Sequence, residues 1–521
     1  MAFRLVNGQD PPDADYVLDA LLRHNYLPMQ KKRREELPPI FSSMTFTPEV
    51  ARKLAQTRAR SGALGYDAVE YRVTRFTGIS RPLSIPHPMP YAQLCLCLYE
   101  NWHHLQGTTD SNVSRVRPQR HSDGRLVMMD YEMHIDEDCR SRELSFGKQY
   151  VVRTDIANFF PSIYSHAVPW AAVGFVEAKA RRFENTWFNN LDKRLRCCKR
   201  EETQGVAIGP ATSSIVSELV LDCVDRVMHS RNYVFERFVD DYSAYCTTEN
   251  EAREFVRELS EELAKYKLTL NAKKTQVRAL PHAFAPTWTS QLANSCPTGQ
   301  PVSRYQAIDY LNMAVSLAKE EPDESVLKFA FKALARQNLD SESQRDTLPY
   351  LLELSFHQPG LLPLAGHLLA SMPPNASAQY AQKFVSLAQE NAKYRRSDGM
   401  CWALYYLNKY AIPIDTATAE NVASSEDCLS LLLLYLSGTK NNQDLVHDFV
   451  GKIGKDRYDL DRYWILLYQL FRDGEIENPY PDEDAFPFLK DHNVTFVDET
   501  ATIEDAPEET SVLLLKLNWS L

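Results

Sequence analysis

The sequence lacks a hydrophobic run long enough to cross a membrane. Of its 521 residues 44% are hydrophobic, yet the longest apolar run lies around residues 431–436. A membrane helix needs about 20 such residues. The first residues also lack the succession of basic, apolar and small residues that marks a secretory signal peptide. We therefore predict a protein without a membrane span, located in the cytoplasm.

The sequence is also poor in cysteine, with ten residues and no Cys-x-x-Cys pair. This excludes a zinc ribbon and a disulfide-rich secreted domain. Cys95 and Cys97, like Cys197 and Cys198, are too close along the chain for an ordinary disulfide between them. Charged residues make up 24% and aromatic residues 11% of the chain, which excludes wholesale disorder.

Charge is distributed unevenly along the chain. Residues 1–300 carry 39 Lys and Arg against 36 Asp and Glu, whereas residues 301–521 carry 19 against 33. The front mixes helical and strand-like patterns, and the back repeats amphipathic helical patterns broken by Pro, Gly and Asn. We therefore predict an α+β unit over residues 1–300 and an all-α unit over residues 301–521. An irregular helical-repeat solenoid is one interpretation of the back unit, and a helical bundle is the other.

Periodicity places the main elements. Apolar residues at helical spacing predict long helices at 211–231 and 249–267, and alternation predicts a strand at 150–154. Asp123-Gly124 predicts a hairpin turn, and two short strands should flank Asp240-Asp241. In the back, we expect helices at 305–318, 324–335, 377–389, 400–407, 427–436 and 462–471.

Three separated segments carry the candidate chemistry. Asp155 ends the first strand, residues 204–210 (Gln-Gly-Val-Ala-Ile-Gly-Pro) form a glycine loop that opens a helix, and Asp240-Asp241 lie in a hairpin turn. Each alone has an ordinary explanation, such as a turn or a helix cap. Together they favour two carboxylate-bearing elements that converge and hold two Mg²⁺ ions, which suits displacement at phosphorus.

In order and type, these segments resemble the palm of reverse transcriptases. Residues 155–160 (Asp-Ile-Ala-Asn-Phe-Phe) are similar to the first catalytic motif, 204–210 to the Gln-Gly loop and 238–241 (Phe-Val-Asp-Asp) to the Tyr-x-Asp-Asp box. Residues 270–275 (Leu-Asn-Ala-Lys-Lys-Thr) resemble the motif that follows the box, and residues 81–86 resemble a fingers segment. Phe238 replaces the usual Tyr, and Gly209 stands where the family has Ser.

The resemblance implies a role for each matching residue. It implies that the metal ligands are Asp155, Asp240 and Asp241, and that Lys274 is a general acid for the leaving pyrophosphate. It further implies that Arg81 contacts the incoming triphosphate, that Phe160 selects deoxyribose, and that Gln204 and Gly205 border the nascent base pair. Solvated lysines, a surface arginine or a core aromatic remain alternatives for Lys274, Arg81 and Phe160, and Arg72 and Arg75 rival Arg81.

A narrower resemblance concerns the prophage abortive-infection (Abi) reverse transcriptases. Its signs are His166-Ala-Val-Pro-Trp170, the Ile-Gly-Pro form of the loop and the helical back. It implies a phage-defence enzyme with a HEAT-like helical domain that builds DNA from deoxynucleoside triphosphates without a template, from a protein hydroxyl. It also implies a homo-oligomer and a single-stranded DNA product attached to the protein. A template-directed reverse transcriptase and a non-catalytic scaffold that binds a phage or host protein are the alternatives. No motif marks the priming residue, for which Tyr26, Tyr66 and Tyr71 are candidates and serines in flexible loops are the alternative.

Overall fold

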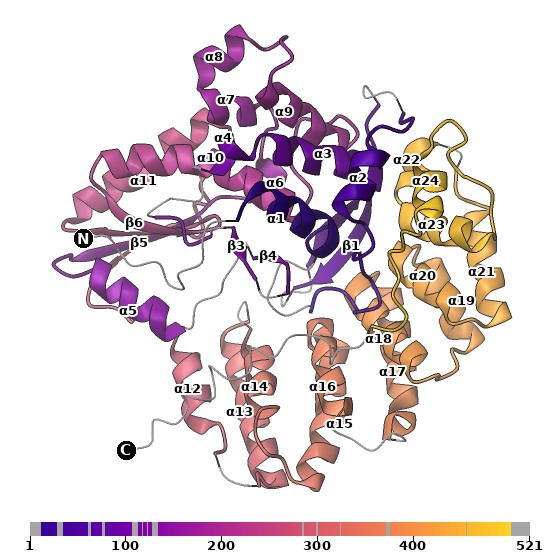
Figure 1. Cartoon of the computed structure of the whole chain (residues 1–521). Coiled ribbons are helices and arrows are strands. Elements are labelled where there is room, and N and C mark those ends of the chain that lie inside the picture. The colour runs from indigo at the N-terminus through magenta and orange to yellow at the C-terminus, as the bar shows by residue number, and fades with distance from the viewer. Residues whose placement is uncertain are drawn as a thin grey trace.

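The computed structural model describes residues 12–28, 35–60, 64–75, 79–106, 113–116, 118–121, 123–127, 134–283, 286–298, 301–322, 325–370, 376–454 and 456–501. Over these residues a mixed α/β part, which extends to β8 (Gln276–Ala279), is followed by a long arc of helices that returns to the N-terminal part (Figure 1). No helix within them is both long enough and apolar enough to cross a membrane. All ten cysteines are free thiols.

A four-stranded antiparallel sheet, here called the central sheet, organises the front of the chain. Its strand order is β6-β7-β5-β8. The strands are β5 (Tyr150–Asp155), β6 (Val234–Phe238), β7 (Asp241–Cys246) and β8 (Gln276–Ala279). The predicted strand at 150–154 and the predicted hairpin around Asp240-Asp241 are confirmed.

Helices cover the central sheet. The two long predicted helices are confirmed as α10 (Ala211–Ser230) and α11 (Glu249–Lys265). Helix α11 packs on β5, β7 and β8, and α10 packs on α11 and α7. Five further helices surround this layer, namely α5 (His134–Leu144), α6 (Phe159–Ser162), α7 (Ala167–Val173), α8 (Phe175–Ala180) and α9 (Trp187–Cys197).

A second antiparallel hairpin, here called the outer hairpin, consists of β1 (Ala68–Thr74) and β2 (Ser80–Pro86). Val69 and Ile85 face each other in its register and are both fully buried. The N-terminal helical elements pack around α3 (Pro88–Glu100), namely α1 (Ala14–Asp19), η1 (Ala20–His24), α2 (Pro48–Leu54) and α4 (Trp102–Leu105). The predicted turn at Asp123-Gly124 is confirmed, because it joins β3 (Gln119–Arg120) to β4 (Leu126–Val127).

After Ala279 the described residues form helices and isolated bridges but no strand. The six predicted helices are confirmed, with shifted ends, as α13 (Arg304–Glu320), α14 (Val326–Leu334), α17 (Ala381–Lys393), α18 (Ser397–Lys409), α20 (Cys428–Leu436) and α23 (Trp464–Asp473). The prediction missed α12 (Thr287–Ser295), α15 (Ser341–His357), η3 (Pro359–Leu364), α16 (Ala365–Ala370), η4 (Ala376–Tyr380), α19 (Thr416–Ser424), α21 (Lys440–Val450), α22 (Arg457–Asp461) and α24 (Ala485–Asp491). Helix α15 contains Pro349, and a proline argues locally against a helix interior.

The last helices pack against the outer hairpin. The indole Nε1 of Trp464 donates to the carbonyl of Ile85 at 3.0 Å. The carboxylate of Asp398 accepts from the backbone N and the hydroxyl of Thr74, at 2.8 and 2.9 Å. Phe41 and Val497 form an isolated antiparallel bridge. The two ends of the described chain therefore share one hydrophobic core.

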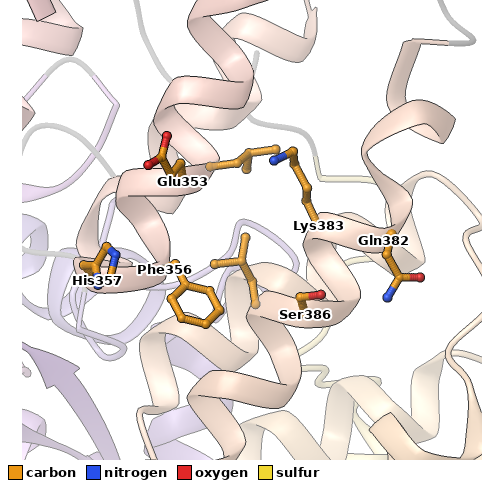
Figure 2. A pocket seen from close by; sticks show the side chains of 8 residues that line it. Glu353, Phe356, His357, Gln382, Lys383 and Ser386 are labelled. Carbon is orange, nitrogen blue, oxygen red and sulfur yellow. The ribbon is translucent and has the colours of Figure 1, made fainter. Parts of the chain in front are cut away.

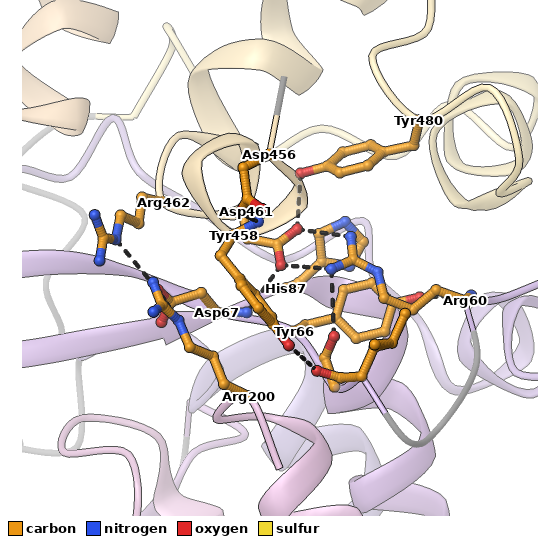
Figure 3. A network of polar contacts seen from close by, with 12 residues as sticks. Arg60, Tyr66, Asp67, His87, Arg200, Asp456, Tyr458, Asp461, Arg462 and Tyr480 are labelled. Carbon is orange, nitrogen blue, oxygen red and sulfur yellow. Dashed lines mark hydrogen bonds and ion pairs between the residues drawn. The ribbon is translucent and has the colours of Figure 1, made fainter. Parts of the chain in front are cut away.

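A buried ionic network holds the same junction (Figure 3). The guanidinium of Arg60 donates two hydrogen bonds to the carboxylate of Asp461, at 2.7 and 2.8 Å, and a third to Glu483 at 2.9 Å. The hydroxyls of Tyr66 and Tyr480 donate to the same two carboxylates. Because the side chains of Arg60 and Asp461 are fully buried, this contact fixes the C-terminal helices to the N-terminal part.

Candidate active site

The central sheet brings the three predicted aspartates together. Asp155 ends β5 and is the Cα partner of Asp241, which begins β7. Asp240 lies in the two-residue turn that joins β6 to β7, and its carbonyl accepts from the backbone N of Ile156 at 3.2 Å. We call residues 238–241 the carboxylate turn. Asp155 is buried, Asp240 is half-buried and Asp241 is exposed.

The electrostatics of this corner show that the carboxylates act on one another. The pKa of Asp240 is raised, first by burial and then by the negative charge of Asp155. Partial desolvation at this corner and the charges of Asp240 and Asp155 raise the pKa of Asp241 to about 6, although the residue as a whole is exposed. Like charges at close range disfavour ionisation of each carboxyl group. A positive charge at this corner would therefore stabilise the ionised carboxylates.

Lys274 supplies part of that positive charge. Its Nζ donates to Oδ2 of Asp155 at 2.8 Å, and this hydrogen bond is the largest cause of its raised pKa. The segment is held in place because the backbone N of Asn271 donates to the carbonyl of Asp155 at 2.8 Å. The adjacent Lys273 is exposed, and its backbone N donates to the side chain of Asn271. The structure therefore places Lys274 on the carboxylates.

The donor set suits a hard divalent cation. Oδ1 of Asp155 is buried and has no hydrogen-bond partner within the described part of the chain. An orphaned buried carboxylate oxygen beside two further carboxylates matches the oxygen ligands that Mg²⁺ prefers. Within the same residues, no group of three or more His, Cys, Asp or Glu side chains forms a preassembled metal cage. Phosphate oxygens of a substrate would then have to complete the shell.

The glycine loop packs directly on the segment that follows Asp155. The backbone N of Gly205 donates to the carbonyl of Ile163 at 2.8 Å, and that of Val206 donates to Phe160 at 3.1 Å. Gly205 has φ +83°, and a Cβ there would lie 3.0 Å from the carbonyl oxygen of Pro161. Both observations require glycine at this position. The side-chain amide of Gln204 donates to the carbonyls of Pro161 and Ser162, at 3.2 and 3.1 Å.

The two phenylalanines after Asp155 differ in burial. Phe159 is 3% exposed and belongs to the core, whereas Phe160 is half-buried and packs at the edge of that core. Their ring centroids lie 5.1 Å apart. Of the two rings, only Phe160 is therefore available to a ligand.

The outer hairpin brings Arg81 to the same corner. The backbone N of Ser84 donates to the carbonyl of Ile208 at 2.7 Å, which joins β2 to the glycine loop. The positive charge of Arg81 lowers the pKa of Asp240, whereas burial and the charge of Asp155 raise it. Arg72 instead pairs with Glu70, and Arg75 is exposed just beyond β1.

The three tyrosines named as priming candidates are buried in this structure. The hydroxyls of Tyr26 and Tyr71 donate to the carbonyls of Pro86 and Glu36, and the hydroxyl of Tyr66 donates to Glu483. Tyr26 and Tyr71 have no exposed surface, and Tyr66 is 3% exposed. In this conformation none of the three presents its hydroxyl to the carboxylates.

A hollow of about 310 Å³ lies elsewhere, between α15 and α17 (Figure 2). Its lining includes Phe356, Glu353 and Lys383. No residue of the central sheet or of the outer hairpin contributes to it, so it is separate from the carboxylates.

Sequence reasoning missed the polar group that supports the carboxylate turn. Arg237, the residue before the turn, is fully buried and pairs with Glu218 and Asp225 of α10. A signal was present, because Glu218 and Asp225 are seven positions apart and therefore lie on the same face of α10, where two acidic side chains favour a basic partner.

Comparison with known proteins identifies the part of the chain that carries this corner. A profile of the family described as reverse transcriptase (RNA-dependent DNA polymerase) matches residues 108–315. The chain contains a reverse transcriptase domain. The match covers Asp155, the carboxylate turn and Lys274, whereas Arg81 lies upstream of it. None of the curated proteins compared with the chain matches it.

Solved structures with some similarity to the chain include telomerases. The apo telomerase of Candida tropicalis is 11% identical with a TM-score of 0.32, and the alignment covers 78% of this chain and 73% of that one. A form of that telomerase truncated from the C-terminal domain is 12% identical, with a TM-score of 0.29 and coverage of 46% and 55%. Telomerase from Candida albicans, in complex with a fragment of telomeric RNA, is 13% identical with a TM-score of 0.29 and coverage of 77% and 67%.

Proposed function

We propose that this protein adds deoxynucleotides to a hydroxyl group and releases pyrophosphate. The observation that carries the proposal is the convergence of Asp155, Asp240 and Asp241, with Lys274 bonded to Asp155. Like charges held close together at one corner cost stability, and such pKa perturbations cluster at functional sites. The surrounding reverse transcriptase domain supports nucleotide transfer as their use.

The three aspartates would hold divalent metal, which we propose to be two Mg²⁺ ions. When bound, the metal supplies Lewis-acid activation of the phosphates and of the attacking hydroxyl. In the transfer step, the hydroxyl oxygen forms a bond to the α-phosphorus, and the bond from that phosphorus to the β-phosphate bridge oxygen breaks. The hydroxyl proton leaves to water, and pyrophosphate departs.

The other predicted residues have roles consistent with their positions. Arg81 would bind the triphosphate, because its positive charge acts on Asp240 from the outer hairpin. Phe160 would pack under the sugar and exclude a 2′-hydroxyl. Lys274 would give a proton to the departing pyrophosphate. Gln204 and Gly205 would border the nascent base from the glycine loop.

We further propose that synthesis is untemplated and protein-primed and serves abortive-infection defence against phage. This part rests on the resemblance of residues 166–170 and of the Ile-Gly-Pro loop to the Abi reverse transcriptases. The product would be single-stranded DNA covalently attached to the protein, within a homo-oligomer. We propose that residues 1–300 form the polymerase unit and residues 301–521 a HEAT-like helical unit. The successive packing of α13 on α14, α17 on α18 and α20 on α21 supports this division.

A purification and incorporation experiment tests the proposal. The full-length protein should copurify with nucleic acid that survives denaturing phenol extraction and is released by nuclease. It should also incorporate labelled deoxynucleotides with Mg²⁺ and no added template, and Asp240→Asn should abolish this. The matched control is Asp309→Asn, an exposed residue of α13. Incorporation that requires an added template would show template-directed synthesis in place of untemplated synthesis. A folded wild-type protein without incorporation would refute the polymerase function.

A further inference from the structure

We propose that Arg237 is the positioning residue of the carboxylate turn: its buried guanidinium holds Val239 in a left-handed backbone conformation and thereby aims Asp240 at Asp155. The inference rests on the proposed use of Asp240 in nucleotide transfer. It assigns the control of that carboxylate to a residue that never contacts the substrate.

The turn contains an unusual backbone conformation. Val239 has φ +55°, a region that L-residues rarely adopt and that is least suitable for a β-branched side chain. Such strain persists only where the surrounding structure enforces it, and it clusters at functional sites. The conformation therefore requires an interaction that holds it.

Arg237 supplies that interaction. Its Nη1 donates to the carbonyl of Val239 at 2.8 Å, across only one intervening residue. The same guanidinium donates to both carboxylate oxygens of Glu218, at 2.8 and 3.0 Å, and its Nε donates to Asp225 at 2.9 Å. A planar guanidinium has its donors in a fixed geometry, so the two acids determine where the remaining donor points. They direct it at the strained carbonyl.

The two acids are themselves fixed. Ser114 donates its hydroxyl hydrogen to Glu218 at 2.8 Å, and the hydroxyl of Tyr242 donates to Asp225 at 3.0 Å. The side chains of Glu218 and Asp225 are 3% and 2% exposed, and that of Arg237 is fully buried. Because two acidic side chains face one arginine, burial of these three charged groups lowers the free energy of unfolding. Apolar side chains would fill the space at lower cost, so stability alone does not explain this choice.

The turn is held from the opposite side as well. The backbone N of Ile156, the residue after Asp155, donates to the carbonyl of Asp240 at 3.2 Å. Val239 and Asp240 are therefore each tied through a carbonyl, one to Arg237 and one to the end of β5. These two ties fix the peptide that carries the Asp240 side chain relative to Asp155.

The decisive experiment combines Arg237→Lys with Val239→Gly. Lysine retains the positive charge but lacks the planar guanidinium, so it cannot bond to Glu218, Asp225 and the carbonyl of Val239 together. We expect Arg237→Lys to weaken Mn²⁺ binding, followed by electron paramagnetic resonance without nucleotide, about 10-fold, and to lower kcat more than it raises KM. Glycine adopts φ +55° freely. Val239→Gly added to Arg237→Lys should therefore restore at least one third of the wild-type Mn²⁺ affinity.

The matched control is Arg226→Lys, because Arg226 pairs with Asp222 on the same helix but is 69% exposed. It should leave Mn²⁺ binding unchanged. A purely structural role of Arg237 would lower the melting temperature without rescue of Mn²⁺ affinity by Val239→Gly, and that result overturns the proposal. If Arg237→Lys does not fold, Glu218→Gln loosens the same guanidinium and is measured with and without Val239→Gly, with the same expectation.

A second measurement separates this inference from the proposed function. Hydrogen exchange of the peptide amides in residues 238–242 reports on the turn without metal or nucleotide. Faster exchange in Arg237→Lys than in wild type and Arg226→Lys supports the positioning role, even if the wild-type protein incorporates no nucleotide. Equal exchange in all three proteins refutes it.

Discussion

Lys274 and Asp155 form an ion pair at 2.8 Å although 119 residues separate them in the sequence. The pair exists because the chain returns after α11, so that Asn271 bonds to the end of β5 and β8 pairs with β5. Lys274 occupies Oδ2 of Asp155, while Oδ1 has no partner among the described residues. One aspartate is thus prepared both for a permanent cation and for a further ligand.

Replacement of Lys274 should impair transfer through loss of the proton donor. We expect Lys274→Met to lower the rate of nucleotide incorporation by about 100-fold, the lower range for general acid catalysis. Lys273→Met is the matched control, because Lys273 is adjacent and exposed. It should retain nearly the full rate in a single-turnover incorporation assay. Similar losses in both variants would show that only local charge matters.

Replacement of Asp241 should stabilise the metal-free protein. With its pKa raised to about 6, the folded protein binds a proton more readily than the unfolded chain. Stability without metal therefore falls as pH rises toward 6, and the charged form remains a cost at pH 7. We expect Asp241→Asn to raise the free energy of unfolding at pH 7 by about 1 kcal/mol, which allows for solvent screening of an exposed group.

Urea denaturation between pH 5 and 8, with EDTA present, measures this gain. The gain should be smallest at pH 5, and Asp309→Asn should show none at any pH. Addition of Mg²⁺ should stabilise the wild-type protein more than Asp241→Asn, because the variant lacks one carboxylate ligand. A loss of stability in Asp241→Asn at pH 7 would contradict the assignment of repulsion at this corner.

The two neighbouring phenylalanines should respond differently to truncation. Phe160→Ala should reduce the preference for deoxynucleotides over ribonucleotides at least 10-fold, since the half-buried ring is the proposed barrier to a 2′-hydroxyl. Phe159→Ala should instead lower the free energy of unfolding by about 3–5 kcal/mol, as expected for a buried aromatic side chain. Competitive incorporation and urea unfolding measure the two effects. Unchanged sugar preference in Phe160→Ala would assign this ring to packing alone.

Removal of one partner from the Arg60 network should release the C-terminal helices. Asp461→Ala leaves a buried guanidinium with only part of its charge compensated, at a cost of about 3–5 kcal/mol. Asp459→Ala is the control, because Asp459 is 48% exposed and pairs with Arg462 at the surface. Limited proteolysis should cleave near residue 461 faster in Asp461→Ala only. Equal unfolding free energies in the two variants would show that the junction does not depend on this ion pair.

The sequence alone determined the order and chemistry of the site. The strand that ends at Asp155, the glycine loop and the turn with Asp240-Asp241 follow from local patterns, because alternation, glycine and paired acids act over a few residues. The same patterns located α10, α11 and six of the later helices.

Only the tertiary structure decided which charged residues serve the site and which support it. Lys273 and Lys274 are equivalent in local sequence, as are Arg72, Arg75 and Arg81, and only strand register and hairpin packing distinguish them. Arg60 and Arg237 look like surface residues in the sequence, because a charged side chain has no periodic signature of burial. Arg60 pairs with Asp461, 401 residues away, and Arg237 of β6 pairs with Glu218 of α10. The burial of the two arginines therefore depends on how these elements pack together. Wherever segments far apart in the chain must meet, the three-dimensional fold carries information that no local pattern contains.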